Sequence, residues 1–152
     1  DQIEVVVQPQ SVIHSMVEFV DGGIIAQLGT PDMKLPIQYA LYEAARLPLS
    51  GSRLDFKTLK QITFEAPDME TFRGLKLAYE AGRCGGTMPT VFNAANEWAV
   101  GRFLKRKIGF LEITDIIDAS MAAHEVTENP SVEQILETEA SVYEFIESRW
   151  NV

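Results

Sequence analysis

The densest group of side chains able to take part in chemistry lies near the start of the chain. Its members are Gln8, Gln10, Ser11, His14 and Ser15, and a second polar stretch, Gly29–Met33, follows later. A serine, a histidine and an acid such as Asp32 are the residue types of a nucleophilic triad, but triads are defined by geometry and no spacing here requires one. The group could also be one wall of a binding site or a polar strand edge, and the residues alone leave these alternatives open.

The other isolated candidates favour structural roles. His14 and His124 are the only histidines, too few for a histidine-based metal site, and His124 ends an expected helix, where a cation is favourable. The single cysteine, Cys84, has no disulfide partner and no neighbouring histidine. We therefore interpret it as an ordinary thiol and expect a reducing, cytoplasmic location.

Two motifs resemble binding sites only superficially. Gly85-Gly86-Thr87 lacks the preceding strand and the following Lys-Ser/Thr of a phosphate-binding loop, so it predicts the end of one helix and the start of another. Asn93, Asn96 and Glu97 could form a polar site. Near the start of a helix, however, such residues more often satisfy backbone donors and hydrogen bonds within a bundle.

Composition and charge narrow the class of protein. The chain is 46% hydrophobic and 23% charged, which is typical of a globular protein that needs neither disulfides nor a structural metal. Its net charge of −9 disfavours nucleic acid as a partner. No apolar run reaches the roughly 18–20 residues of a membrane span, and no signal peptide is recognisable. Because the first residue is not methionine, we expect a piece of a longer polypeptide.

Residues 3–30 show strand patterns. Ser11–Val20 is rich in β-forming residues, and the turn dipeptide Asp21-Gly22 precedes a second apolar run, Gly23–Leu28, which together predict a hairpin. If Ser11–Val20 is a regular strand, every second residue from Ile13 to Phe19 lies on one face, and we expect that face to be buried.

The rest of the chain predicts a connecting segment followed by helices. Pro36 favours a helix over Ile37–Arg46, and Leu59–Phe64 reads as a short strand. Four amphipathic helices follow, one capped by Asp68 and reaching about Ala81, one opened by Pro89, one over about Glu112–Ala123, and one after Ser131, which forms a capping box with Gln134.

The predicted fold class is therefore α+β. A short antiparallel or mixed β segment with a hairpin (1–36) is followed by a linker (37–67) and a C-terminal four-helix-type bundle (68–152).

Several motifs together resemble the 1-deoxy-D-xylulose 5-phosphate reductoisomerase family. They are Pro9–Val17, Ala26–Met33, Pro36-Ile37, Leu54-Asp55-Phe56, Phe64-x-x-Pro67-Asp68 and Asn93-Ala94-Ala95-Asn96-Glu97, in the same order. The likeness covers nearly the whole chain. One departure is Gln8, where the family usually has histidine.

The resemblance implies an enzyme that rearranges and reduces a phosphorylated sugar, with NADPH and Mg²⁺ or Mn²⁺, in isoprenoid synthesis. The Asp-Ser-Glu and Asn-Lys-x-x-x-Glu motifs that hold the metal in that family do not occur in this sequence, nor does a GxGxxG fingerprint. We therefore expect no metal ligands in this chain, no bound cofactor and no activity of the chain by itself.

The resemblance also implies roles for individual residues. His14 would be catalytic, near the metal and substrate. Ser11 would bind substrate, as would a loop formed by Pro31, Asp32 and Met33, and Met33 would also lie beside the nicotinamide ring. The partners implied are a phosphate-bearing small molecule and a second copy of the chain, held through the β segment. The alternative is a stand-alone, non-enzymatic dimerisation or interaction module.

Overall fold

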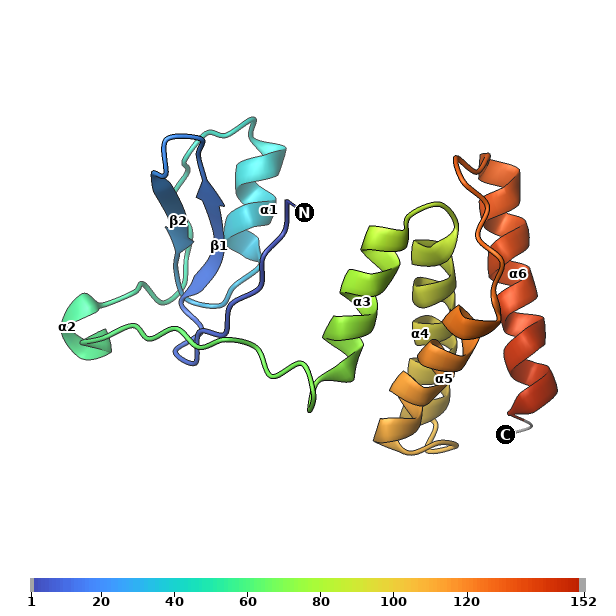
Figure 1. Ribbon diagram of the computed structural model, residues 1–152. Helices are drawn as coiled ribbons and strands as arrows, with labels where there is room; N and C mark the ends of the chain where they lie inside the picture. Colours follow the sequence, from blue (N-terminus) through green and yellow to red (C-terminus); the bar gives the residue numbers. More distant parts are fainter. Residues whose placement is uncertain (1, 151–152) are drawn as a thin grey trace. The chain divides into compact units, whose positions relative to one another are not determined.

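The computed structural model describes residues 2–150, so residues 1, 151 and 152 of the expected segments lie outside its described part. The described chain forms two compact units, residues 2–67 and the residues from 68 onward (Figure 1). The elements, in chain order, are β1 (Ile13–Glu18), β2 (Ile24–Leu28), α1 (Lys34–Leu41), α2 (Phe56–Leu59), α3 (Arg73–Cys84), α4 (Met88–Leu104), α5 (Phe110–Ala123) and α6 (Val132–Arg149). The predicted α+β class is confirmed.

The first unit is built on a hairpin. β1 and β2 pair antiparallel, and Phe19 N donates to Gly23 O at 2.9 Å across the predicted turn. The ladder is irregular between Ile13 and Ser15, which disturbs the alternation of the two faces. Val17 and Phe19 remain 57% and 49% exposed, so the expectation that their face is buried is wrong for this chain: no second layer of the described residues covers it.

Local features of the chain set where the two helices of the first unit begin. α1 starts at Lys34, earlier than expected. The N–H groups of a first helical turn have no partner within the helix, so Pro36, which has no N–H, fits at any position of that turn. Asp55 accepts a hydrogen bond from Lys57 N at 2.9 Å and starts α2. The predicted strand Leu59–Phe64 is wrong, because Leu59 ends α2 and residues 60–64 form no strand. Glu65, the next residue, forms an isolated bridge with Val7.

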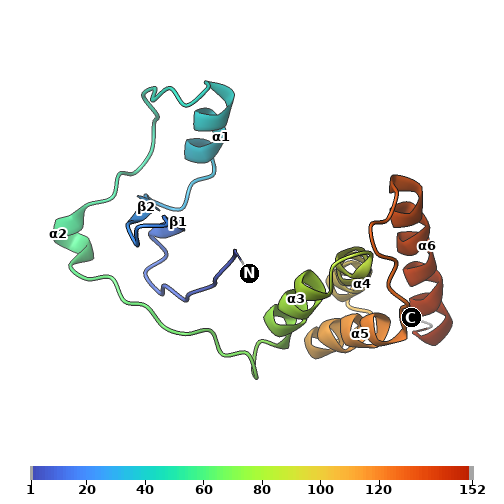
Figure 2. The same cartoon turned by 45° about the horizontal axis from the view of Figure 1, so that its top comes forward.

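Residues 37–67, expected as a linker, belong to the same compact unit as residues 2–36. Figure 2 shows α1 and α2 apart from the two strands, with non-helical chain on both sides of each helix. Backbone hydrogen bonds of the hairpin and of the Val7–Glu65 bridge, together with side-chain hydrogen bonds, connect this unit, whereas it has little buried apolar core.

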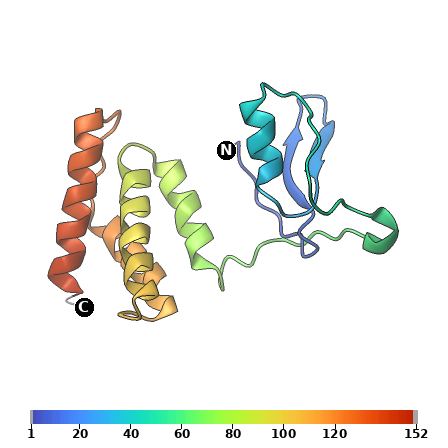
Figure 3. The same cartoon turned by 180° about the vertical axis from the view of Figure 1, so that it is seen from behind.

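The second unit is the predicted four-helix bundle, α3 to α6 (Figure 3). Its core consists of apolar side chains from all four helices and of Ile108 in the connection between α4 and α5. The helical members are Leu77, Ala81, Met88, Val91, Ala94, Ala95, Ala99, Ile113, Ile116, Ile117, Val142 and Ile146. Ser131 and Gln134 form the predicted capping box of α6, with bonds of 3.3 and 2.9 Å. Asp68 caps a turn through Glu70 and Thr71, but α3 begins only at Arg73 because Phe72 is not helical.

Buried hydrogen bonds join the start of α4 to the segment that follows α5. Thr87 is fully buried, and its hydroxyl lies 2.7 Å from His124 Nε2 and accepts from Thr127 N at 3.0 Å. Burial lowers the pKa of the His124 imidazole, which disfavours the charged form that would suit a helix C-terminus. Gly85 and Gly86 both have positive φ, so the predicted helix stop and re-entry is confirmed.

None of the helices described in the structure has both the length and the apolar character needed to cross a membrane.

Candidate functional site

The hairpin places His14 beside the start of the second polar stretch. Gly29 N donates to Val12 O at 2.9 Å, and His14 Nε2 lies 3.2 Å from Gly29 O. Because a carbonyl oxygen can only accept, Nε2 must carry the proton. In a neutral ring, Nδ1 is then left with a free lone pair, able to accept from a ligand at the protein surface.

Ser11 sits in a tight turn that leads into β1. Its φ is +51°, in the left-handed region, and its N donates to Gln8 O at 3.0 Å. Gln8 Oε1 accepts from Val12 N at 2.8 Å and Ile13 N at 3.3 Å. The turn therefore presents an exposed serine hydroxyl next to buried Val12.

The same turn is tied to a distant part of the chain. Gln8 Nε2 donates to Gln10 Oε1 at 2.6 Å. Gln10 in turn donates from Nε2 to Thr63 Oγ1 at 2.9 Å and accepts from Thr63 N at 3.1 Å. Residues 8–13 are thus fixed to residues 63–65, which also pair with Val7.

Side-chain contacts within and next to the loop hold the loop that is expected to bind substrate. Thr30 Oγ1 donates to Ser52 O at 2.9 Å. Asp32 Oδ1 accepts from Lys34 N at 2.9 Å, and its Oδ2 lies 3.9 Å from Lys34 Nζ. Pro31 is exposed, and Met33 is 69% exposed. Asp32 therefore shapes the entry to α1, while Met33 is free to contact another molecule.

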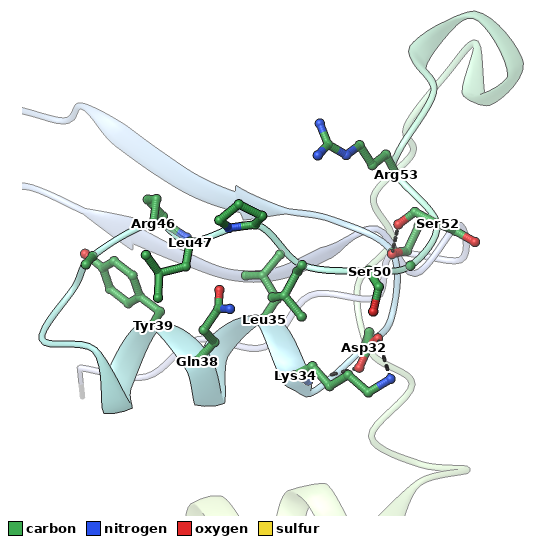
Figure 4. A pocket seen from close by; sticks show the side chains of 15 residues that line it. Asp32, Lys34, Leu35, Gln38, Tyr39, Arg46, Leu47, Ser50, Ser52 and Arg53 are labelled. Carbon is green, nitrogen blue, oxygen red and sulfur yellow. Dashed lines mark hydrogen bonds and ion pairs between the residues drawn. The ribbon is translucent and has the colours of Figure 1, made fainter.

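A hollow of about 230 Å³ lies beside this loop, between α1 and residues 45–53 (Figure 4). In Figure 4, Asp32, Lys34 and Ser50 lie at one end, and Tyr39 and Arg46 lie at the other. The Arg46 guanidinium stands 4.1 Å from the centre of the Tyr39 ring. Residues 45–53 carry no recognisable motif that would have predicted that they fold back on the loop.

The expected site residues fall into two groups. Ser11 and His14 lie at the end of the hairpin next to Gly29, whereas Asp32 and Met33 lie at the start of α1. Among the described residues His14 bonds to a backbone carbonyl and Asp32 to Lys34, so Ser11, His14 and Asp32 form no catalytic relay. Nor does the described part of the chain hold three or more histidine, cysteine or acidic side chains grouped as a metal site would need.

The other candidates lie in the bundle. Asn93 Nδ2 donates to Glu97 Oε1 at 3.2 Å along the exposed surface of α4. Cys84 is exposed near the end of α3. The residues that sequence reasoning did not single out as a unit are Gln8, Gln10 and Thr63. The first two belong to the polar cluster, but their connection to Thr63 spans more than fifty residues.

Comparison with known proteins identifies the family of this chain. The chain is 62% identical over 98% of its length to 1-deoxy-D-xylulose 5-phosphate reductoisomerase of Agathobacter rectalis, and 61% identical over 99% to that of Lachnospira eligens. It spans 39% and 40% of those two proteins.

Comparison with solved structures points to the same family. The reductoisomerase of Zymomonas mobilis in complex with NADPH matches with a TM-score of 0.81 and 45% identity, over 91% of this chain and 37% of that one. A DOX-P reductoisomerase in complex with NADPH, fosmidomycin and magnesium matches with a TM-score of 0.85 and 37% identity, over 96% of this chain and 38% of that one. The family model described as DXP reductoisomerase C-terminal domain matches residues 28–145, and this chain therefore belongs to that family.

Proposed function

We propose that this chain is the C-terminal part of a 1-deoxy-D-xylulose 5-phosphate reductoisomerase, which converts its substrate to 2-C-methyl-D-erythritol 4-phosphate with NADPH. The observation that carries the proposal is the 62% identity over 98% of the chain to a protein of that name. Since the chain spans about 40% of such relatives, the proposed activity belongs to the whole enzyme.

Within that enzyme, residues 1–36 would belong to the catalytic domain and residues 68–152 would be a structural bundle. His14 would be catalytic through its free Nδ1, which can accept a hydrogen bond from a substrate hydroxyl while Gly29 O fixes the ring. Ser11 would bind the substrate through its exposed hydroxyl. Both sit on the same strand end, so one phosphorylated sugar could reach both.

The loop after β2 would complete the substrate side. Pro31 and Asp32 would shape it, and exposed Met33 would contact substrate and the nicotinamide ring of NADPH. NADPH supplies the hydride when bound, and relatives have been solved with NADPH and with magnesium. The described residues have neither a dinucleotide-binding fold nor a group of three metal-binding side chains, so they do not fit either group by themselves.

A chimera tests the proposal directly. The upstream part of the Agathobacter rectalis relative, joined to this chain in place of its own matching region, should show substrate-dependent oxidation of NADPH. The chain alone should show none. His14→Ala in the chimera should lower kcat/KM by about a hundredfold or more, because a positioned catalytic group is lost. Glu18→Gln at the other end of β1 is the matched control. An inactive but folded chimera would refute the proposal.

The hairpin also supports a homodimer. Val17, Phe19 and Ile25 lie on one face of the hairpin and are all about half exposed or more, and an uncovered apolar face of this kind needs a partner. We expect light scattering to give twice the 17.0 kDa mass of the chain. Ile25→Glu should yield monomer, whereas Leu136→Glu on the exposed surface of α6 should not. A monomer at every concentration would contradict the dimer.

The free cysteine fits a reducing, cytoplasmic location.

A further inference from the structure

The Ser11 turn has a shape that serine does not prefer. Its φ of +51° lies in the left-handed region, which non-glycine residues adopt only where neighbouring contacts hold them. Pro9 lies within this turn, after Gln8, and restricts Gln8, but it offers no backbone donor. Contacts from neighbouring residues must therefore hold Ser11 in this conformation.

Gln8 supplies these contacts. Its Oε1 accepts from the backbone N of both Val12 and Ile13, the two residues that follow Ser11, at 2.8 and 3.3 Å. Its own backbone O accepts from Ser11 N at 3.0 Å. One residue thus binds three consecutive backbone donors, and these bonds define the path of the chain through Ser11.

The orientation of the Gln8 amide is fixed by what surrounds it. Two N–H groups face one end, so that end must be the oxygen, and the nitrogen end then donates to Gln10 Oε1 at 2.6 Å. Gln10 Oε1 accepts a second bond from Thr63 N, and Gln10 Nε2 donates to Thr63 Oγ1. Every group in the network has a partner of the right kind, which a flipped amide would not allow.

We propose that Gln8 is a positioning residue of the substrate site. Supported by Gln10 and Thr63, it holds the turn that presents the Ser11 hydroxyl and the strand that carries His14. The proposal rests on the proposed function for the meaning of the site, but the geometry of the network can be tested in this chain alone. It also gives a role to the position where the family resemblance has histidine.

The first test uses nuclear magnetic resonance on the 152-residue chain. The amide protons of Val12 and Ile13 should be protected from exchange in the wild type, and Gln8→Ala should reduce both protection factors at least tenfold. Gln61→Ala, an exposed glutamine two residues from Thr63, should leave them unchanged. Equal protection in the wild type and Gln8→Ala would overturn the proposal whatever the enzyme does.

The second test uses the chemistry of the substituted side chain. In Gln8→His, a neutral imidazole can accept from Val12 N, but a protonated one cannot, because both of its nitrogens then carry hydrogen. Protection at Val12 should therefore be lost below a pH of about 6.5, the ordinary pKa of histidine. His14 and Glu65 also lie close to this region and are present in the wild type, which should show no such change. Protection of Val12 that is equal in the wild type and Gln8→His at every pH would count against the proposal.

The third test uses the chimera, provided it is active. Gln8→Ala should raise KM for the phosphorylated substrate roughly tenfold to a hundredfold by misplacing Ser11, with KM for NADPH unchanged. Gln8→His should recover most of this loss at pH 8 but not at pH 5.5. A simple loss of folded enzyme would lower kcat with both KM values unchanged, and that result would overturn the proposal. An inactive chimera would refute the proposed function, while the exchange measurements would still decide the role of Gln8.

Discussion

The two units of the chain bury their apolar residues very differently. In the bundle, Ile116 and Ile146 are fully buried and belong to a core drawn from all four helices. In residues 2–67, Val12 is the one apolar side chain of the described residues that is buried, whereas Ile24, Ile25 and Leu41 are 61%, 67% and 75% exposed. The bundle therefore has a buried apolar core, whereas the described residues of the first unit leave most of their apolar side chains exposed.

This contrast indicates which unit needs further contacts to be stable. A two-stranded hairpin is at best marginally stable by itself, and its apolar face must be covered by another layer. The bundle has short connections and a continuous core, so its stability comes from within. The candidate site lies in the dependent unit, which agrees with the proposal that its upstream partners complete it.

The largest expected effect compares a buried and an exposed isoleucine. Ile116→Ala should lower the free energy of unfolding of the bundle by about 2–5 kcal/mol, because it removes packing and leaves a cavity. Ile25→Ala should change it by less than about 0.5 kcal/mol. Urea denaturation followed by tryptophan fluorescence measures this, since Trp98 and Trp150 both lie in the bundle. Equal effects of the two substitutions would mean that the units do not differ as described.

The next effect tests how closely the connection between α3 and α4 packs against the segment after α5. Gly86 has a φ of +54°, and a Cβ there would collide with the carbonyl oxygen of Thr127 and lie 2.8 Å from Val126 Cγ1. Gly86→Ala should therefore destabilise the bundle by about 2–4 kcal/mol. Gly82→Ala is the matched control: it lies in α3 with open space around it, and it should stabilise by about 0.5–1 kcal/mol. The same fluorescence assay distinguishes the two signs.

The bundle was the more predictable unit because its signals are local. Apolar residues three and four apart predicted α4, α5 and α6, and the Ser131 and Gln134 pair marked the start of α6 within three residues. The error at Asp68 was also local. The capping bonds form, but the non-helical Phe72 separates that turn from α3.

The first unit was less predictable because its structure depends on distant contacts. Alternation along Ser11–Val20 predicted a buried face, but the ladder is irregular at His14 and no layer of the described chain covers the strands. The family motifs led us to predict Ser11 and His14 as site residues. They did not reveal that Gln10 bonds to Thr63, or that residues 45–53 line a hollow beside Asp32. Contacts of this kind leave no periodic pattern in a sequence.

The smallest expected effect is a pH dependence confined to the bundle. Burial lowers the pKa of His124 below its ordinary 6.5, although the nearby charge of Glu125 opposes this. The unfolded chain then binds a proton more tightly than the folded bundle, so stability is complete above pH 6.5 and falls as the pH falls below it. The urea midpoint seen by tryptophan fluorescence should be lower at pH 5.5 than at pH 7.5. His124→Gln, which can still accept from Thr87 but does not titrate, should remove this difference. Because carboxylates stay largely ionised in this window and His14 lies in the other unit, an unchanged wild-type midpoint would mean that His124 is not held neutral by the fold.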